Sequence, residues 1–356
     1  MNDTTLTNVK FLIALCCFLN FLFGSVVAQS TEDHSWIVYQ GEQGPGQGKH
    51  IVLVSGDEEY RSEEALPMLA KILAYRHGFK CTVLFAINPE TGKIDPDYQK
   101  NIPGLETLKD ADLMVLFTRF RELPRDQMEH ILNYVEAGKP TIGMRTATHA
   151  FRFPEDSPYQ KYSFNSKVTG WEGGFGRQVL GETWISHHGH HGQESTRGLV
   201  NGLVEAHPVL KGVKDVWGPT DVYGITEIEG EETVLLYGQS LLGMTPESQP
   251  NFDKSVVPIA WIKNYETQSG ESCRVFNTTM GAAVDLESSD LRRLIVNATY
   301  WCMGLEEQIP EENNVALVGE YEPTFFGFGD AQQGLSPADF AVDQQTVEQA
   351  QSKGSR

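Results

Sequence analysis

The N-terminal half of the chain alternates short apolar runs with segments in which apolar residues recur every three or four positions. The runs contain few polar residues, which is typical of strands covered on both faces. They lie at residues 51–54, 81–85, 111–117 and 141–144. The helix-like segments run from Ser62 to Gly78 and from Pro124 to Gly138, each ended by a glycine. This alternation predicts an α/β fold, a three-layer doubly wound domain around a mainly parallel sheet.

The pattern weakens between residues 150 and 232 and then returns. The middle stretch is rich in Gly, His, Trp and Tyr, so we interpret it as an insertion that builds a site rather than as a disordered linker. A final helix is predicted after Ser288 and ends at Gly304. Before it, strands are predicted at 233–237, 257–262 and 274–277.

Both ends of the chain differ from the domain expected at 48–305. An apolar run follows Lys10, and small residues close it, so residues 1–28 predict a secretory signal peptide, with an uncleaved anchor as the alternative. No later segment is apolar enough to span a bilayer, and we expect an exported protein, periplasmic or extracellular. Residues 306–356 form an acidic and polar tail. Its aromatic part, 315–328, is expected to dock on the domain, and flexibility is expected from about 330 onward.

The charge of the chain restricts its partners. The formal net charge is −20, and no basic stripe interrupts it, so nucleic acid and anionic membrane surfaces are excluded as partners. After the leader, three cysteines remain in apolar contexts, Cys81, Cys273 and Cys302. We expect buried free thiols, and one disulfide at most.

Polar residues follow three of the predicted strands at the point where each strand ends. Ligands of an open parallel sheet bind beyond the carboxyl ends of its strands, so these residues are expected to share one crevice. Carboxylates, guanidinium groups and an imidazole that face one another perturb each other's pKa values. The alternatives are a solvated acidic turn that caps a helix and simple ion pairing of its acids with the arginines. The residues are Asp57, Glu58, Arg119, Arg121, Arg145 and His149.

A second candidate is the run Trp-Ile-Ser-His-His-Gly-His-His-Gly at 184–192, which holds four of the ten histidines. Imidazole both binds metal ions and transfers protons near neutral pH. Such a run predicts a loop that holds one divalent metal ion through His187, His188, His190 and His191, and the alternative is an exposed polar loop without a task. Imidazole-rich sites suit Zn, Ni, Cu or Fe, and added carboxylates admit Mn.

Several motifs together resemble the ThuA-like family, named for trehalose utilisation, whose fold is similar to class I glutamine amidotransferases and is flavodoxin-like. They are Gly-Lys-Pro-Thr-Ile-Gly-Met-Arg at 138–145, Ala-His-Pro-Val-Leu-Lys-Gly-Val at 206–213, Thr-Asp-Val-Tyr at 220–223, Val-Pro-Ile-Ala-Trp-Ile-Lys at 257–263 and Arg-Val-Phe-Asn-Thr-Thr-Met-Gly at 274–281. The resemblance covers about 48–305.

Two departures from the related folds limit what the resemblance implies. An amidotransferase of this fold carries a cysteine nucleophile at the turn after the elbow strand, where this chain has Arg145-Thr146-Ala147. Glutaminase chemistry by a thiolate is therefore excluded there. Many ThuA-like members carry Gly-His where this chain has Gly281-Ala282.

The resemblance implies a role in carbohydrate metabolism, on glycosides oxidised at carbon 3 to a ketone. Such a hydrolase or lyase needs a base, an acid and an electrophile. We expect a carboxylate such as Glu58 or Asp221 and a histidine such as His149 or His188 as acid and base, and a metal ion held by the histidine run as electrophile. Tyr223 and Trp171 are expected to stack on or hydrogen-bond the sugar, with ordinary packing as the alternative.

The candidate catalytic set is therefore Asp57, Glu58, Arg145, His149 and Asp221, and the candidate substrate-binding set is Arg119, Arg121, Trp171 and Tyr223. The expected partner is a small-molecule carbohydrate. Two other classes of protein remain as alternatives, a non-catalytic carbohydrate-binding module and an exported protein that only holds metal.

Overall fold

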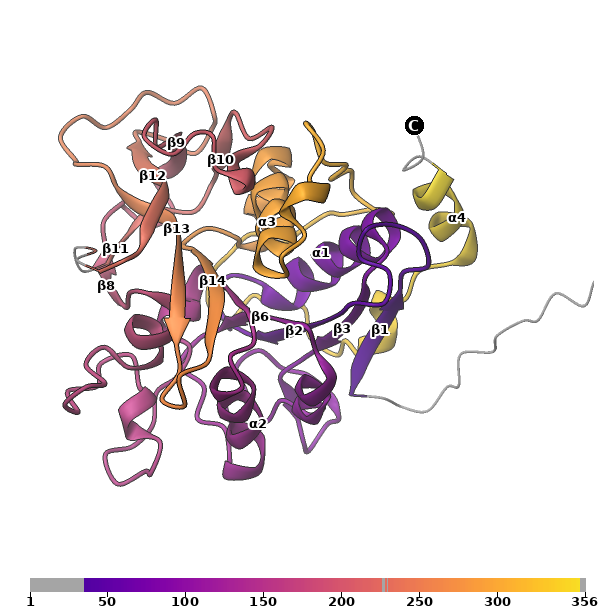
Figure 1. Cartoon of the computed structure of the whole chain (residues 1–356), viewed down its shortest axis with the longest axis vertical. Coiled ribbons are helices and arrows are strands. Elements are labelled where there is room, and N and C mark those ends of the chain that lie inside the picture. The colour runs from indigo at the N-terminus through magenta and orange to yellow at the C-terminus, as the bar shows by residue number, and fades with distance from the viewer. Residues whose placement is uncertain (1–34, 226–227, 229, 353–356) are drawn as a thin grey trace, which may run out of the picture. The chain divides into compact units, whose positions relative to one another are not determined.

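In the computed structural model, which describes residues 35–225, 228 and 230–352, ten strands form one mixed sheet (Figure 1). Five neighbouring strands in its middle are parallel, and their order follows the flavodoxin-like pattern in which the first strand lies between the second and the third. In spatial order they are β3 (Lys80–Leu84), β2 (His50–Gly56), β6 (Leu113–Thr118), β7 (Thr141–Met144) and β14 (Ser272–Thr278). The predicted three-layer α/β fold is confirmed.

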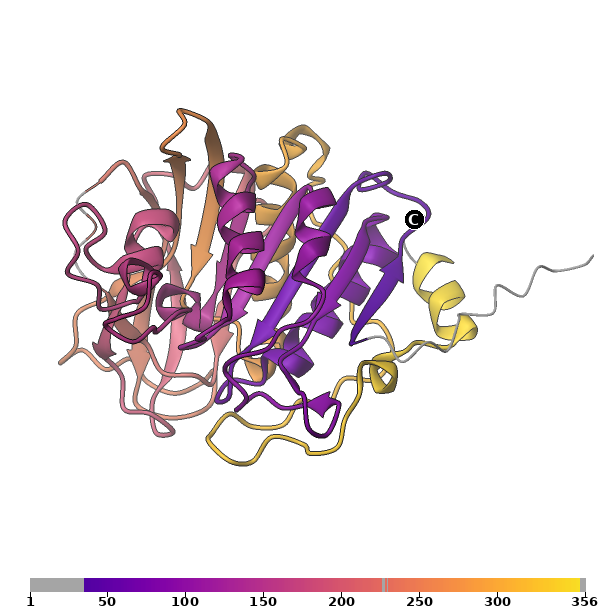
Figure 2. The same ribbon diagram turned by 90° about the horizontal axis from the view of Figure 1, so that it is seen from below.

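Helices cover both faces of the parallel strands (Figure 2). On one face lie α1 (Ser62–His77) and α3 (Ser289–Cys302), and on the other lies α2 (Arg125–Glu136). Alternate residues of β2 point to the two layers, and all are fully buried: Ile51 and Leu53 join the cluster with α1 and α3, while Val52 and Val54 join the one with α2. Continuous apolar runs are therefore what a strand between two helical layers requires.

The C-terminal half adds antiparallel strands that the hydrophobic pattern did not predict in full. Beyond β14 follow β13 (Val257–Glu266), β12 (Thr233–Leu241), β9 (Ser195–Val200) and β10 (Val216–Gly218), and β1 (Trp36–Gln40) pairs with β3 at the other edge. The strands β9 and β10 belong to the stretch 150–232, which thus extends the sheet as well as building loops. Two small ribbons pair β8 (Trp184–His187) with β11 (Tyr223–Ile225) and β4 (Ile87–Asn88) with β5 (Lys93–Ile94).

Short helical turns connect these elements and bring several site residues into place. The 3₁₀ turn Arg145–His149 directly follows β7. A π-helical turn covers Gly176–Leu180. The other 3₁₀ turns are Leu105–Asp110, Gln160–Tyr162, Pro208–Leu210, Ala283–Glu287, Glu306–Gln308 and Pro337–Phe340.

Helix α1 begins at Ser62, where the helical pattern of the sequence begins. Arg61, in the left-handed conformation, occupies the N-cap position, and Ser62 is the first helical residue. The Ser62 hydroxyl lies 2.8 Å from that of Ser55 and accepts a hydrogen bond from the Asp57 amide at 3.0 Å. Ser62 therefore holds the turn between β2 and α1, and the helix ends at Gly78 as predicted.

The tail holds more secondary structure than its polar sequence predicts. Helix α4 (Gln344–Ser352) packs on α1, and the Arg76 guanidinium donates hydrogen bonds to the Ala350 and Leu317 carbonyls. The Tyr321 hydroxyl donates to the Ala283 carbonyl at 2.8 Å. The tail therefore lies against the α1 layer of the domain (Figure 1).

Three further sequence predictions concern the leader, membrane helices and the cysteines. The predicted signal peptide at 1–28 lies outside the described residues. Within the described part of the chain, none of the helices combines the length and apolar character needed to cross a membrane. Cys81, Cys273 and Cys302 are free and buried, as predicted.

Candidate functional site

Backbone strain is concentrated where three parallel strands end. Among the described residues, the non-glycine residues with left-handed φ are Arg61 (59°), Phe120 (50°) and Arg145 (43°). They follow β2, β6 and β7 respectively. Such conformations cost on the order of 1–3 kcal/mol each and persist where the surroundings fix them, as at functional sites. The carboxyl edge of the parallel sheet is therefore the first place to look for chemistry.

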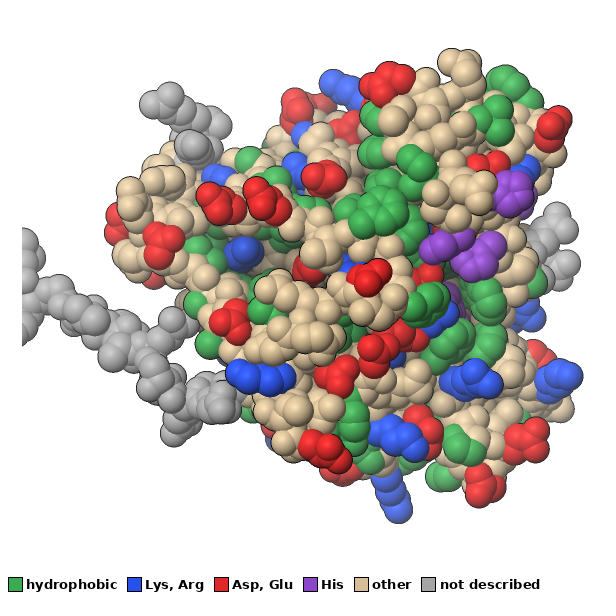
Figure 3. All heavy atoms as spheres, turned by 180° about the vertical axis from the view of Figure 1, so that it is seen from behind, with side chains coloured by type: hydrophobic (Ala, Val, Ile, Leu, Met, Phe, Trp, Pro, Cys, Tyr) green, Lys and Arg blue, Asp and Glu red, His purple; other side chains and the backbone are tan. Residues whose placement is uncertain are grey.

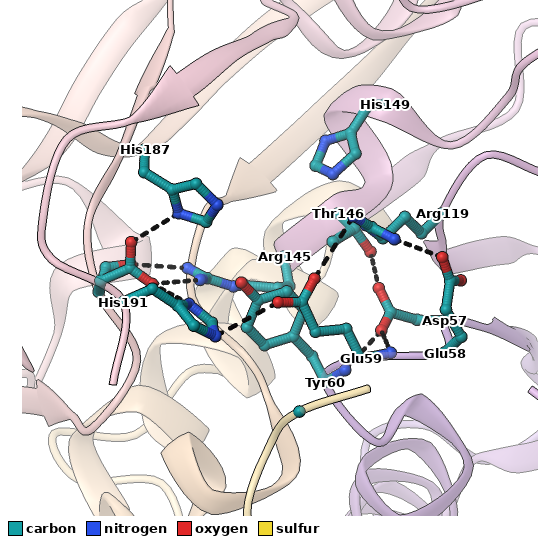
Figure 4. A network of polar contacts seen from close by, with 12 residues as sticks. Asp57, Glu58, Glu59, Tyr60, Arg119, Arg145, Thr146, His149, His187 and His191 are labelled. Carbon is teal, nitrogen blue, oxygen red and sulfur yellow. Dashed lines mark hydrogen bonds and ion pairs between the residues drawn. The ribbon is translucent and has the colours of Figure 1, made fainter. Parts of the chain in front are cut away.

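Asp57 fixes the turn after β2 to the turn after β7. Its fully buried carboxylate accepts hydrogen bonds from the amides of Glu59 at 2.7 Å and Tyr60 at 2.5 Å, and from the Thr146 hydroxyl. These three bonds occupy both oxygens (Figure 4). Asp57, predicted as catalytic, holds the two turns together, and the carboxylate that it positions is Glu59.

Glu58 and Arg121 form a buried ion pair beneath the site. The Arg121 Nη2 lies 2.6 Å from Glu58 Oε2, and Arg121 also donates to the carbonyls of Arg119 at 2.7 Å and Pro96 at 2.9 Å. The Arg121 side chain, predicted to bind substrate, has no exposed surface in this structure and serves as the buried partner of Glu58. Burial and then the charge of Asp57 raise the pKa of Glu58, although Arg121 and Arg119 oppose the shift. Both residues act as structural charges.

Glu59 and Arg119 face the site instead. Glu59 Oε2 lies 3.5 Å from Arg119 Nη2, and Glu59 Oε1 lies 3.4 Å from His191 Nε2. Burial raises the pKa of Glu59, with Arg119 opposing the shift, so this carboxyl is suited to exchange a proton. Arg119 also bonds Glu58, and its side chain is 18% exposed. Glu59 was missed among the predicted catalytic residues because a turn gives no periodicity that says which acid points inward.

Arg145 occupies the elbow after β7. Its guanidinium lies 4.1 Å from the centre of the Tyr60 ring and 5.2 Å from that of Tyr223. It donates hydrogen bonds to the carbonyls of Thr279 at 2.7 Å and Asp221 at 3.0 Å. The elbow thus has the strained geometry that carries a nucleophile in other α/β enzymes, but here it carries a buried fixed positive charge.

Asp221 gathers the two site-facing histidines. Its Oδ2 lies 2.8 Å from His187 Nδ1, its Oδ1 lies 3.0 Å from His191 Nδ1, and Arg145 Nη2 is 3.5 Å from Oδ1 (Figure 4). Burial opposes ionisation of Asp221, but the bonds to His187 and His191 outweigh it and hold the pKa well below its usual range. The hydrogen bond to Asp221 in turn raises the pKa of His187.

The same three side chains, His187, His191 and Asp221, form the group that fits a metal ion. One ligand atom from each lies within 4.8 Å of the others. Two imidazole nitrogens and one carboxylate oxygen, with further positions open, are a donor set used for catalytic zinc and related divalent ions. The residues present therefore fit the predicted metal.

His188 and His190 turn to other partners, so the structure does not bring the four predicted ligands together. His188 Nε2 lies 2.8 Å from the Ser255 carbonyl, and His190 Nδ1 lies 3.4 Å from Glu194. Figure 3 shows histidine side chains gathered on one face of the molecule with hydrophobic side chains beside them. Only the first and last histidines of the run, His187 and His191, reach Asp221, because the turn after β8 points the two between them toward Ser255 and Glu194.

His149 lies in an aromatic enclosure at the opposite side of Glu59 from Tyr60 in the view of Figure 4. Its ring centre is 5.1 Å from that of Phe120 and 5.2 Å from that of Trp184, and Nδ1 lies 3.2 Å from the Thr148 hydroxyl. Burial, then the charges of Arg119 and Arg145, lowers the pKa of His149 well below its usual value, so the ring is neutral.

The two predicted sugar-binding aromatics both have packing roles. Trp171 lies 4.7 Å from the Tyr162 ring, and no ring contact joins it to a site residue among the described residues. Tyr223 is buried, and its hydroxyl bonds the Arg145 carbonyl and, at 2.8 Å, the Thr148 hydroxyl. Trp184, next to His149, is the half-buried tryptophan of the site and was not predicted.

Comparison with known proteins gives one family and several solved structures. The model of the ThuA family, described as trehalose utilisation, matches residues 50–302. A ThuA-like protein from Bacteroides uniformis is 18% identical, with 73% of this chain and 92% of that chain covered and a TM-score of 0.45. A ThuA-like protein from Parabacteroides merdae is 16% identical, with 72% and 90% covered and a TM-score of 0.48. A search of curated protein sequences found no match.

Proposed function

The chain belongs to the ThuA family, described as trehalose utilisation, and from this premise we propose that it is an exported enzyme that cleaves 3-keto glycosides by acid–base chemistry. The observation that carries the proposal is the grouping of Glu59, His187 and Asp221 at one edge of the sheet. Their environments push the pKa values of Glu59 and His187 up and that of Asp221 down. Groups whose pKa values are shifted in opposite directions can serve as an acid and a base at the same pH.

The reaction proceeds by elimination and then addition of water. A ketone at C3 acidifies the C2 proton, and Glu59 takes this proton as general base. As the C1–C2 double bond forms, the bond from C1 to the glycosidic oxygen breaks. The leaving oxygen receives a proton from His187 when that ring is not bound to a metal ion, and from the protonated Glu59 carboxyl when it is. Water then adds its hydroxyl to C1 and a proton to C2, giving the free 3-keto sugar. A lyase releases the unsaturated sugar before water adds.

Arg119 is the group suited to the negative charge that develops on the ketone oxygen. Its guanidinium is held by Glu58 and Glu59 and remains partly exposed at the site. A preorganised cation beside a developing oxyanion stabilises the transition state more than the ground state. His149, neutral and enclosed by aromatic rings, is suited to hydrogen-bond a sugar hydroxyl.

A divalent metal ion is part of the proposal. His187, His191 and Asp221 would hold it, and when bound it would polarise the ketone oxygen as a Lewis acid. Asp221 and Glu59 also orient the His191 ring, since each contacts one of its nitrogens.

Export is proposed from the sequence of the first 28 residues. Expression of the full chain with its leader tests it, through the N-terminal sequence of the protein recovered outside the cytoplasm. Cleavage close to residue 28 supports export, and a full-length intracellular chain contradicts it.

The activity is tested with methyl 3-keto-glucoside in deuterated water, followed by NMR. The proposed enzyme exchanges the C2 proton for deuterium and releases methanol faster than the buffer control. Exchange without methanol release rejects glycoside cleavage. Saturable binding without exchange instead identifies a non-catalytic carbohydrate-binding module, and neither binding nor exchange contradicts the proposal.

A further inference from the structure

A segment of the tail reaches the site from outside the part of the chain that matches the family. Residues 323–329, here called the strap, lie beyond the matched range 50–302. The Gly327 amide donates to the Glu59 carbonyl at 2.8 Å, and Arg61 Nη1 donates to the Gly327 carbonyl at 2.8 Å. The strap is thus bound to the turn that carries Glu59 through both the amide and the carbonyl of Gly327.

Further contacts fix the strap at its start. The Thr324 hydroxyl accepts a hydrogen bond from Arg61 Nε at 3.0 Å and donates to Glu64 at 2.6 Å, while the Thr324 amide bonds Glu64 at 2.7 Å. Arg61 is one of the residues in the left-handed conformation. The strained backbone of Arg61 therefore belongs to the same residue whose guanidinium binds the strap.

Phe326 anchors the strap within the site. It is almost fully buried, and its ring centre lies 5.6 Å from that of Tyr60 and 5.0 Å from that of His191. One candidate metal ligand therefore packs directly on the tail. The position of the strap is fixed relative to the groups that would carry the chemistry.

Two neighbouring phenylalanines of the strap are exposed beside this anchor. Phe325 is 52% exposed and stacks on Phe326 with ring centres 4.3 Å apart. Phe328 is 58% exposed, and its ring centre lies 5.0 Å from the guanidinium carbon of Arg119, the cation that faces Glu59. Large apolar side chains held in place at the rim of a polar site expose surface that a ligand can cover.

We propose that the strap is a subsite of the enzyme proposed above, at which Phe328, with Phe325, stacks on the second sugar ring of a 3-keto disaccharide. The inference rests on that proposed function. The apolar face of a neutral pyranose matches an aromatic ring, whereas anionic ligands and membranes are repelled by a chain of net charge −20. Phe328 packs on Arg119, the cation proposed to face the ketone oxygen, so a sugar ring stacked on Phe328 would adjoin the sugar that is cleaved.

The subsite predicts a difference between two ligands, measured by calorimetry on the intact protein. Phe328→Ala should weaken binding of a 3-keto disaccharide by about two- to tenfold more than it weakens binding of methyl 3-keto-glucoside, the effect of one aromatic stacking contact. Phe325→Ala should act in the same direction with a smaller effect. Phe252→Ala is the matched control, since Phe252 is 86% exposed and no ring contact joins it to a site residue in the described part of the chain.

The outcomes separate this inference from the proposed function. If the unaltered protein binds both ligands and Phe328→Ala binds them equally well, the subsite is wrong and the proposed function stands. If the unaltered protein binds neither ligand, both are wrong. Loss of self-association in Phe328→Ala, with sugar binding intact, would identify the rings as a contact between copies and overturn the subsite. Unfolding temperatures of all three variants, expected to match the unaltered protein because the rings are exposed, exclude misfolding as the cause.

Discussion

The strand ends of the parallel sheet and the histidine loop at 184–192 both bring charge to the site, but they do so in opposite ways. At the strand ends, Glu58, Arg121 and Arg145 are buried and each has several fixed partners. In the loop, the side chains of His187 and His191 are 48% and 35% exposed and share Asp221. Residue type alone points to chemistry in both regions, whereas the fixed partners of each group decide which side chains hold the site and which can exchange a proton or a ligand; Glu59 is as buried as Glu58 but contacts His191 and Arg119.

Glu59→Gln should produce the largest effect. Glu59 is the acid among the three turn carboxylates that contacts both regions, through Arg119 and His191. The amide keeps the shape but cannot accept the C2 proton, so cleavage of methyl 3-keto-glucoside should fall about 10²- to 10⁴-fold. The unfolding free energy should change little.

Glu106→Gln is the control for this change, since Glu106 is an exposed carboxylate in the 3₁₀ turn Leu105–Asp110. It should retain full activity. Equal rates for Glu59→Gln and the unaltered protein would show that Glu59 is not the base, and His149 would be the next candidate.

Arg121→Leu should be the most damaging change to stability. It leaves Glu58 with one of its two cationic partners and removes bonds to the Arg119 and Pro96 carbonyls. Breaking a buried ion pair in this way costs about 3–5 kcal/mol, measured by urea unfolding. Arg125→Leu, at a side chain that is 85% exposed, should change the unfolding free energy by less than about 0.5 kcal/mol. Similar losses in the two variants would refute the distinction between buried and exposed charge.

Low pH should destabilise the protein through its buried histidine, His77, more than through the histidines of the loop. Burial lowers the pKa of His77 from its ordinary 6.5 to about 4, and the ring bonds Tyr300 at 2.9 Å and the tail carbonyl of Asn314 at 2.8 Å. Between these values the unfolded chain binds a proton that the folded chain does not. This group therefore makes stability fall as pH drops from 6.5 to about 4, by roughly 3 kcal/mol in total.

His77→Gln should flatten this part of the stability curve, measured by urea unfolding at several pH values. His188→Gln, at a half-buried position of the loop, should keep the slope of the unaltered protein. A slope that His77→Gln leaves unchanged would show that another group controls the acid response.

The sequence predicts the parallel strands better than the antiparallel ones, because burial on both faces leaves a local pattern in the sequence and long-range strand pairing does not. Strands such as 51–54 are buried on both faces and read as unbroken apolar runs, whatever their neighbours are. By contrast, β10 has three residues, and β9 carries Arg197 and Gly198, so neither shows a run or an alternation. Strand β9 forms because it pairs with β12, and β10 forms because it pairs with β9, and no local pattern records either pairing.

The same reasoning explains which site residues could be predicted. Strand ends placed Arg119, Arg145 and His149 at one edge, and Asp221 was correctly grouped with the candidate residues. The sequence cannot tell Glu58 from Glu59, because Arg61, with its left-handed φ, and the bonds of Asp57 set the direction of each acid in the turn. Trp171 and Trp184 could not be told apart, since only tertiary packing places one beside His149.

Paired histidine variants test the central claim most directly. The measurement is metal content by elemental analysis together with cleavage of methyl 3-keto-glucoside, for His187→Ala/His191→Ala and for His188→Ala/His190→Ala. The account predicts that the first variant loses both metal and activity, since its rings share Asp221, and that the second retains both. Equal losses, or equal retention, in the two variants would contradict the assignment of the site to His187, His191 and Asp221.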